Sequence, residues 1–235
     1  MKSAAQSGRR PSPRRAVRIG VLGGTFNPIH LAHLRSAEEV REAQGLDRIL
    51  FVPSATPPHK GAGNLASSAH RLAMVRLAIA GNRRFQVSTL EVDRGGRSYS
   101  VDTLRALGAQ IPAARLTFIM GLDAFREIDT WKEYRALFEL CDVVVTSRPP
   151  FRRPAGLSIL PVAVRSHFWY QRDKGIVHQS KGTRVIFQPI TDLEVSASAI
   201  RQHLASGSSI RYLVPDSVLR YIQRHGLYAP GAVSR

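Results

Sequence analysis

The stretch Gly23-Gly24-Thr25-Phe26-Asn27-Pro28-Ile29-His30-Leu31-Ala32-His33 decides the fold of this chain. An apolar run over residues 17–22 precedes it and has the character of a buried β-strand. Apolar residues at helical spacing follow it, from Leu31 to Val40, and Gly45 marks the end of that pattern. The stretch is therefore predicted to be the turn between a strand and a helix.

A strand, a glycine turn and a helix in this order can bind a phosphate group. Gly23 and Gly24 lack the Cβ atoms that would hold the main chain away from a ligand. The start of the helix offers free N–H groups and a positive dipole potential for an anion. Asn27 is predicted to be the N-cap of this helix and Pro28 its first residue, so the sequence itself marks the helix start.

Two histidines follow the turn closely. His30 and His33 are three residues apart, about 60° around a helix axis, so both imidazoles share one face of the first turn. They can meet an anion held by the turn. Two other interpretations stay open: half of a metal site, or histidines that only cap or pack. No Cys/His/Asp cluster elsewhere has the spacing to complete a zinc site, which disfavours the metal interpretation.

The composition is typical of one soluble α/β domain. The chain has 235 residues, of which 43% are hydrophobic and 22% charged. No apolar run approaches the roughly 18 residues of a membrane span, and the N-terminus has no hydrophobic segment typical of a secretory signal. The single cysteine, Cys141, excludes an internal disulfide and is typical of a reducing compartment. We therefore expect a cytoplasmic protein that does not enter a membrane.

A formal net charge of +17 suggests nucleic acid as a partner, but the charge is unevenly distributed. Residues 1–18 carry six basic residues and no acid, which leaves +11 for the rest. Residues 1–16 are predicted to be a disordered basic leader, either a weak polyanion-binding arm or, as favoured here, a solvated extension. A body that holds phosphorylated substrates also has reason to be positive. No nucleic-acid module motif is present, so specific nucleic-acid binding is not expected.

The rest of the chain alternates strand and helix patterns, which predicts a Rossmann-like, doubly wound parallel sheet in a single α/β domain. The predicted strands are residues 48–52, 85–92, 116–120, 143–146 and 185–190. The predicted helices are residues 70–80, a segment after Tyr99, a segment after Asp123 that includes Trp131, and residues 195–205. We expect one domain over residues 17–228 with a helical C-terminal segment, followed by a tail over residues 229–235. Residues 150–184 are interpreted as an insert, either a flap over the active site or a subunit contact.

Several polar residues follow the predicted strands, where ligands bind in open α/β sheets. Lys60 lies in the loop after residue 53 and could reach a phosphate, although a lone loop lysine is usually only solvated. Asp123 could accept hydrogen bonds from ribose hydroxyls or cap a helix instead. Ser196, Ser198 and Arg201 could bring hydroxyls, helix N–H groups and a guanidinium to one anion. Each of these signals is weak when taken alone.

The stretch 23–33 resembles the signature of the nucleotidyltransferase superfamily with a paired-histidine phosphate motif, most of all that of the bacterial nicotinate-nucleotide adenylyltransferases. Residues 195–201, about 170 residues later, resemble the family's second signature, and the pair is highly specific. Asn27 stands where aspartate is common and Ala32 where glycine is. Both are tolerable, because Asn caps a helix about as well as Asp and Ala is still small. The resemblance covers roughly residues 17–228.

This resemblance implies the transfer of AMP from ATP to nicotinate mononucleotide, giving deamido-NAD and pyrophosphate in NAD synthesis. By the general logic of phosphoryl transfer, Mg²⁺ is expected on the phosphates of ATP. It implies catalytic roles for His30, His33 and Arg201. The implied ATP-binding residues are Gly23, Gly24, Thr25, Phe26, His33, Lys60, Gly121, Asp123, Ser196, Ser198 and Arg201. The implied residues on the nicotinate side are Tyr99, Ser100, Thr103, Trp131 and Arg148. No protein-bound metal is expected, and an oligomer is compatible with the sequence.

Two alternatives stay open. The first is the same chemistry on another acceptor, such as nicotinamide mononucleotide or phosphopantetheine. The phosphopantetheine branch is usually shorter and should lack the segment with Trp131, whereas nicotinate is favoured over nicotinamide only by the resemblance. The second is a nucleic-acid-binding protein, which would bind DNA or RNA tightly and salt-dependently even without residues 1–16.

Overall fold

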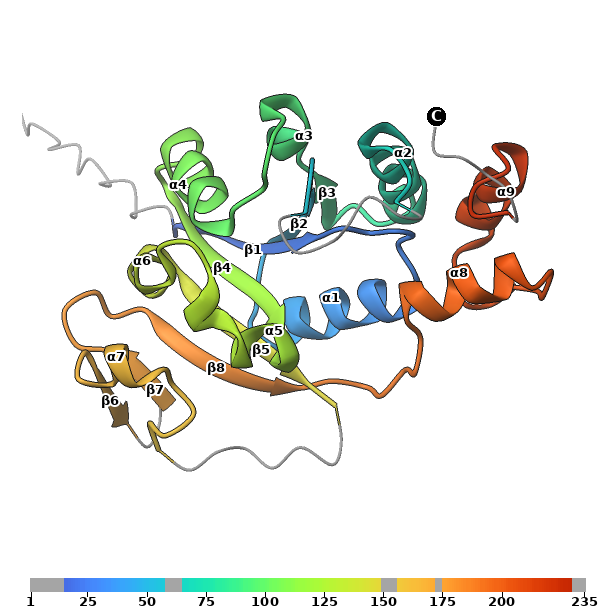
Figure 1. The fold of residues 1–235 in the computed structure, drawn as a ribbon. Helices are drawn as coiled ribbons and strands as arrows, with labels where there is room; N and C mark the ends of the chain where they lie inside the picture. Colours follow the sequence, from blue (N-terminus) through green and yellow to red (C-terminus); the bar gives the residue numbers. More distant parts are fainter. Residues whose placement is uncertain (1–14, 58–64, 149–155, 172–174, 230–235) are drawn as a thin grey trace, which may run out of the picture.

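The computed structural model describes residues 15–57, 65–148, 156–171 and 175–229. Its strands are β1 (Val17–Gly24), β2 (Arg48–Pro53), β3 (Phe85–Val87), β4 (Ala114–Gly121), β5 (Asp142–Ser147), β6 (Phe168–Gln171), β7 (Gly175–His178) and β8 (Arg184–Pro189). In the described residues they form one eight-stranded sheet in the order β3-β2-β1-β4-β5-β8-β7-β6 (Figure 1). The strands from β3 to β8 in this order are parallel, while β7 and β6 are antiparallel additions. The predicted Rossmann-like fold is confirmed.

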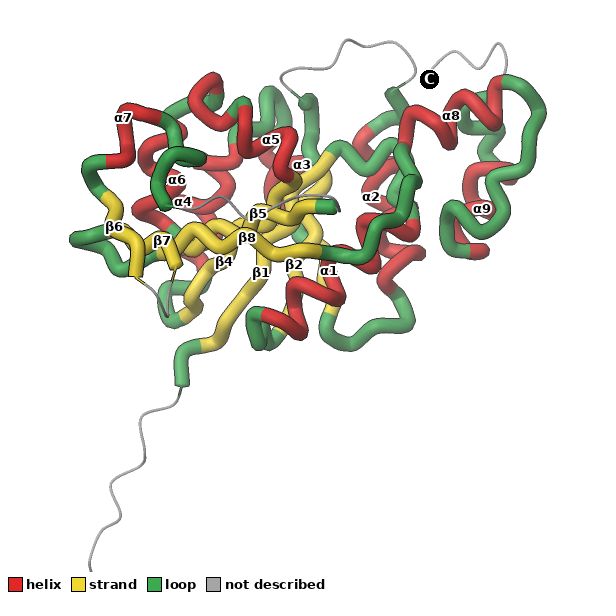
Figure 2. The backbone as a smooth tube through the Cα atoms, turned by 90° about the horizontal axis from the view of Figure 1, so that it is seen from below, coloured by secondary structure: helices red, strands yellow, loops and turns green. Residues whose placement is uncertain are grey.

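Helices cover both faces of the sheet (Figures 1 and 2). They are α1 (Leu31–Ala43), α2 (Ser68–Ile79), α3 (Leu90–Arg94), α4 (Ser100–Gln110), α5 (Leu122–Arg126), the 3₁₀ helix η1 (Ile128–Thr130), α6 (Tyr134–Leu140), α7 (Val162–Arg165), α8 (Ala197–Ala205) and α9 (Asp216–Arg224). Successive side chains of a strand point to opposite faces. In β4, Phe118 and Met120 therefore join the core under α4 to α7, whereas Ile119 joins the core with α1, α2, α8 and α9. Burial on both faces explains why the central strands are apolar runs.

Two of the predicted elements are wrong in detail. The strand predicted over residues 85–92 ends at Val87, and α3 begins at Leu90. The chain turns there because the Ser88 hydroxyl accepts a hydrogen bond from the N–H of Leu90 at 3.3 Å, in place of a continued strand ladder. Trp131 was predicted to be helical but has extended backbone between η1 and α6.

The insert over residues 150–184 extends the sheet in its described part. β6 and β7 form an antiparallel pair, and β7 continues the sheet beside β8. Phe168 and Ile176 are buried in the same core as Phe187, which anchors this pair to the domain. None of the described residues of the insert lines the pocket at the carboxyl ends of the central strands.

Some predictions fall where the structure gives no description. Residues 1–14, residues 230–235 and Lys60 lie outside the described residues. Of the predicted leader only Arg15 and Ala16 are described, and Arg15 forms an ion pair with Asp47. No helix among the described residues has both the length and the apolar character that a membrane crossing needs.

The topology creates a crevice at the carboxyl ends of the central strands. β1 lies between β2 and β4, so the chain builds outward from β1 on one side and then crosses to β4 on the other. In open parallel sheets, ligands bind at the carboxyl ends of the strands where the strand order reverses in this way. The turn after β1 and the start of α5 after β4 both lie at this crevice.

Candidate active site

A pocket of about 1180 Å³ opens at the carboxyl ends of β1, β4 and β5. Its wall includes the glycine turn after β1, the first turns of α1, α5 and α8, and residues at the start of α4. Pockets for one small molecule usually have volumes of roughly 300 to 1,000 Å³. The pocket therefore has room for two substrates that must meet.

The glycine turn is built around the ring of Phe26. Phe26 has a positive φ of 49° and its ring is buried. A Cβ atom on Gly24 would lie only 3.0 Å from that ring, so a larger residue there would force the ring of Phe26 to shift. The Phe26 ring also contacts His33 edge-on, with 5.2 Å between the ring centroids. Phe26 therefore supports His33 from inside the protein and does not line the pocket, contrary to its predicted contact with ATP.

Helix α1 begins later than the sequence predicted. Its N-cap is His30, and Asn27 and Pro28 belong to the turn before it. The prediction that Asn27 caps the helix is wrong, because its side chain is engaged elsewhere. Asn27 Oδ1 accepts hydrogen bonds from the N–H of Ala66 at 3.0 Å and from the Tyr228 hydroxyl at 2.7 Å. Asn27 thus ties the turn to two remote segments of the chain.

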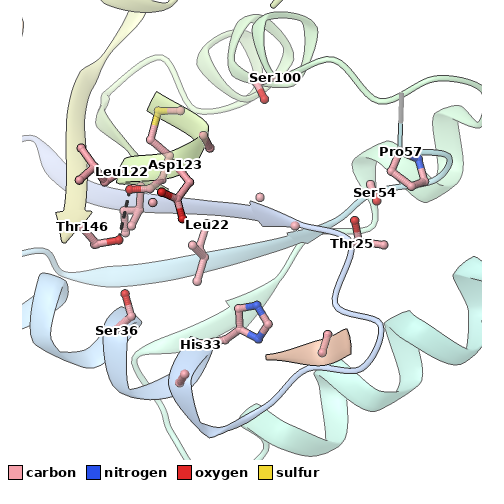
Figure 3. A pocket seen from close by; sticks show the side chains of 18 of the residues that line it. Leu22, Thr25, His33, Ser36, Ser54, Pro57, Ser100, Leu122, Asp123 and Thr146 are labelled. Carbon is pink, nitrogen blue, oxygen red and sulfur yellow. Dashed lines mark hydrogen bonds between the residues drawn. The ribbon is translucent and has the colours of Figure 1, made fainter. Parts of the chain in front are cut away.

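The two histidines form one unit. Their ring centroids are 3.7 Å apart, and the His33 ring points into the pocket (Figure 3). His33 Nδ1 accepts the main-chain N–H of His30 at 3.3 Å, which leaves Nε2 as the N–H donor of a neutral His33 ring. His30 Nδ1 is buried without a hydrogen-bond partner among the described residues. Burial, with a smaller contribution from the charge of Arg148, lowers the pKa of His30 to about 4, so this imidazole is neutral at pH 7.

We expect a His30→Gln substitution to flatten the pH dependence of folding stability in weak acid. The pKa of His30 is about 4 in the folded chain, whereas an unfolded histidine has a pKa of about 6.5. Burial of the neutral imidazole therefore leaves the free energy of unfolding at its full value above about pH 6.5 and lowers it as the pH falls towards 4. At about pH 5 this loss amounts to about 2 kcal/mol. Urea unfolding at about pH 7.5 and about pH 5 measures it. Between these pH values the wild type should lose about 2 kcal/mol more than the variant. Equal losses would contradict the burial of a neutral His30.

The start of α8 reaches the same pocket. Ser196 is the N-cap, and its hydroxyl accepts the N–H of Ala199 at 3.1 Å and lies 3.1 Å from the Ser198 hydroxyl. Arg201 donates from Nη1 to the main-chain oxygen of Asn27 at 2.8 Å, across 174 positions of sequence. The two serines and Arg201 line the pocket together with the histidine pair. The two signature segments are therefore in direct contact.

The ends of β4 and β5 form another part of the wall. The Asp123 side chain is fully exposed and points into the pocket (Figure 3). The N-cap of α5 is Gly121, so the alternative that Asp123 caps this helix does not hold. Arg148 lies just past β5, also on the wall, with its side chain half exposed and 3.9 Å from Asp192. The exposed carboxylate of Asp123 and the guanidinium of Arg148 thus both line the pocket.

Aromatic residues line the end of the pocket near α4. Trp131 packs edge-on against Phe118, with 6.3 Å between ring centroids. The Lys132 ammonium lies 4.9 Å from the centroid of the Tyr99 ring and donates to the Asp102 carboxylate at 2.9 Å. This end therefore offers flat apolar surfaces with polar groups beside them, which suits an aromatic ring.

Thr103 was predicted to face this end but lies behind it. Its side chain is buried, and its hydroxyl donates to the Glu91 carboxylate. Burial raises the pKa of Glu91, and the hydrogen bond from Thr103 opposes this shift. Thr103 does not line the pocket, contrary to the prediction, because its hydroxyl satisfies a buried carboxylate instead.

The other predicted site residues within the described chain line the pocket. They are Gly23, Gly24, Thr25, His30, His33, Tyr99, Ser100, Gly121, Asp123, Trp131, Arg148, Ser196, Ser198 and Arg201. The structure therefore brings together residues from segments that are far apart in the sequence. What each does for a ligand stays a prediction.

Sequence reasoning missed several polar residues of the wall. They are Ser36, Ser54, Glu91, Ser98, Lys132, Thr146 and Ser147. Ser36 follows His33 by three positions on α1, so helical spacing would have found it. Thr146 and Ser147 end a parallel strand, which is also a usable signal. Glu91 had no such signal, because residues 85–92 were predicted to be a strand. Ser98 follows the glycine pair Gly95-Gly96 just before the predicted helix start, so its position was a usable signal.

Fold and site together define a nucleotidyltransferase-type enzyme: the chain belongs to the cytidylyltransferase-like family, whose model matches residues 21–203. The probable nicotinate-nucleotide adenylyltransferase of Geobacter sp. (strain M21) is 49% identical over 212 residues, covering 90% of this chain and 98% of that protein. The protein of the same name from Geobacter sulfurreducens is 46% identical over 214 residues, covering 91% of this chain and 99% of that protein.

Solved structures of similar fold carry related names. Plasmodium falciparum nicotinic acid mononucleotide adenylyltransferase complexed with NaAD superposes with a TM-score of 0.69 at 20% identity, covering 90% of this chain and 97% of that one. The same protein complexed with APC gives a TM-score of 0.67 at 19% identity, with the same coverage. At this level of identity the likeness supports the fold alone.

Proposed function

We propose that this chain transfers AMP from ATP to nicotinate mononucleotide, giving deamido-NAD and pyrophosphate in NAD biosynthesis. The observation that carries the proposal is the contact between Arg201 and the main chain of Asn27, which holds both signature segments on one pocket. The names of relatives that match nine-tenths of this chain indicate the substrate pair. The pocket also has the size that two substrates require.

The chemistry that suits this site is a direct displacement. An oxygen of the mononucleotide 5′-phosphate is already an anionic nucleophile near neutral pH. It attacks the α-phosphorus of ATP, and the bond to the bridging oxygen breaks as pyrophosphate leaves with the electron pair. No covalent enzyme intermediate and no general base are needed. The protein supplies alignment of the two phosphates and stabilisation of the charge that develops.

The proposed phosphate contacts come from the two helix starts. His33 Nε2–H would donate to the reacting α-phosphate, because its Nδ1 is already an acceptor for His30. The neutral His30, whose ring centroid lies 3.7 Å from that of His33, would hold the triphosphate through a hydrogen bond without adding a charge. Ser198 and Arg201 would hold the β- and γ-phosphates with charge-assisted hydrogen bonds. The amide-rich starts of α1 and α8 add positive potential on both sides.

The proposed nucleoside contacts come from the opposite walls. Asp123 and Gly121 would hold the adenosine ribose, since an exposed carboxylate can accept from both of its hydroxyls. Tyr99, Ser100 and Trp131 would surround the pyridine ring. Arg148 would act on the nicotinate side, as the resemblance implies.

We propose that ATP enters as its Mg²⁺ complex. Among the described residues, no group of three or more His, Cys, Asp or Glu side chains is arranged to hold a metal ion. The ion would therefore stay on the phosphates and water, as Mg²⁺ commonly does. Bound there, it would neutralise phosphate charge, while the residues of this chain align the two phosphates.

Steady-state kinetics of the full chain tests the acceptor. We expect ATP with nicotinate mononucleotide to release pyrophosphate and form deamido-NAD. Its kcat/KM should exceed that of nicotinamide mononucleotide by about tenfold or more, because a site that binds a carboxylate leaves polar groups unpaired against an amide. Phosphopantetheine should not react. A preference for nicotinamide mononucleotide would change the acceptor, and the absence of pyrophosphate release with either pyridine nucleotide would overturn the proposal.

A further inference from the structure

Arg71, on α2, is the largest fully buried side chain among the described residues. Its guanidinium donates to four main-chain oxygens. Nε donates to Ala66 at 3.0 Å, and Nη2 donates to Ala55 at 2.7 Å. Nη1 donates to both Thr25 at 2.9 Å and Ser54 at 2.6 Å. One side chain therefore joins the glycine turn, the loop after β2 and the segment before α2.

Two of these four residues belong to the pocket. Thr25 and Ser54 line its wall, as Figure 3 shows, whereas Arg71 lies behind them and does not. Their main-chain oxygens bond to the same guanidinium nitrogen, so the distance between the turn and the loop depends on Arg71. A direct hydrogen bond from the N–H of Ser54 to the Gly24 oxygen, at 3.0 Å, joins the same two segments.

The charge of Arg71 is costly at this position. Within the described ranges, no carboxylate lies at salt-bridge distance from it, and burial lowers the pKa of Arg71. The four carbonyl dipoles stabilise the buried cation, and the more distant charge of Glu91 adds to this. An apolar side chain of similar volume would fill the same space without that cost. The planar fork of a guanidinium does what neither an apolar chain nor a lysine can, because it sets the directions of several carbonyls at once.

We infer that Arg71 is a positioning residue, which holds the glycine turn against the loop after β2 so that Thr25 and Ser54 keep the phosphate end of the pocket in its reactive shape. Its effect on catalysis rests on the proposed function, since it assumes that this end holds reacting phosphates. Its effect on the position of the glycine turn does not rest on the proposed function. The two effects are tested separately.

Amide hydrogen exchange tests whether Arg71 holds the glycine turn against the loop after β2, and it does not depend on enzymatic activity. In the Arg71→Lys variant, exchange should rise severalfold in residues 23–26 and 53–57 and stay unchanged in β4. The matched control is Arg76→Met, an exposed arginine on the same helix, which should leave all of these segments unchanged. Unchanged exchange in residues 23–26 and 53–57 would overturn the inference. An equal rise in β4 would also overturn it, because it would mean that Arg71 only adds global stability.

Kinetics then tests the consequence, once the wild type has been shown to react. At a temperature where circular dichroism shows both proteins folded, Arg71→Lys should lower kcat about tenfold or more, because small misplacements of reacting groups are costly. The KM for nicotinate mononucleotide should stay within about threefold, since Arg71 does not line the pocket. A kcat within about twofold of wild type would overturn the role in positioning. An inactive wild type would instead overturn the proposed function and leave the exchange result standing.

Chemical rescue with guanidinium tests the role of the Arg71 side chain even in variants that are less stable than the wild type. Arg71→Ala leaves a cavity that a guanidinium ion fits, whereas Arg71→Met fills it. We expect about 10 mM guanidinium chloride, compared with equal sodium chloride, to raise kcat per folded molecule severalfold in Arg71→Ala and not in Arg71→Met. Equal responses of the two variants would overturn the assignment of the effect to the guanidinium fork.

Discussion

A His33→Ala variant should show a kcat about a hundredfold or more below wild type, with the fold intact. His33 is the pocket histidine whose Nδ1 accepts the N–H of His30, so in a neutral ring Nε2 carries the N–H that we propose donates to the α-phosphate. Removing one preorganised donor from a developing anion typically costs about 10² to 10³ in rate. The ring contact with Phe26 is lost as well, which affects stability only modestly. The measurement is kcat at saturating ATP and nicotinate mononucleotide, with circular dichroism for the fold.

The matched control for this prediction is His203→Ala. His203 is an exposed histidine on α8 that does not line the pocket, so its removal should leave kcat unchanged. A His33→Gln variant keeps a side-chain N–H donor and should retain more activity than His33→Ala. A near-wild-type rate for His33→Ala would remove His33 from the chemistry.

Arg201→Ala should lower kcat/KM for ATP by about a hundredfold or more. The variant loses a cation that faces the proposed β- and γ-phosphates, and charge-assisted hydrogen bonds are the strong ones in such sites. It also loses the hydrogen bond from Nη1 to the Asn27 oxygen, so the glycine turn and α8 are no longer tied by that contact. Both losses act on ATP more than on the second substrate. Initial rates at varied ATP, with nicotinate mononucleotide saturating, measure the effect.

Two further variants separate charge from geometry in this prediction. Arg201→Lys keeps the charge but loses the planar fork, so it should recover only part of the lost kcat/KM. Arg220→Ala removes an exposed arginine on α9 and should have no effect, which controls for net charge. If Arg201→Ala left kcat/KM for ATP within about twofold of wild type, the second signature would have no part in binding the triphosphate.

The sequence predicted the parallel core well because the physical cause of these elements is local. Strands buried on both faces are continuous apolar runs, so β1, β2, β4, β5 and β8 were all expected near their observed ranges. The first helix was recognised by its apolar spacing and by Gly45, which follows its end. The positions of the two signature segments at strand ends then followed from the topology of such sheets.

The errors arose where a side chain finds a tertiary partner that no local sequence pattern reveals. Asn27 is a good N-cap by type, yet Ala66 and Tyr228 both donate to its side chain. Thr103 has the right hydroxyl for a ligand, yet it donates to Glu91. Phe26 sits in the signature, but its ring packs inward beneath His33. Local propensity describes what a residue can do, and tertiary partners decide which of those options it takes.

By itself the sequence determined the chemical inventory of the site, because residue types and helix or strand periodicity are written locally. It identified the glycine turn, the paired histidines and the basic residue of the second signature. Only the tertiary structure decided how these groups meet. Arg201 reaches Asn27 across 174 positions, and Arg71 gathers oxygens from separate loops behind the pocket. The reason is physical: a hydrogen bond between remote segments has no local periodicity, so it forms only when the packed sheet and helices bring its partners within reach.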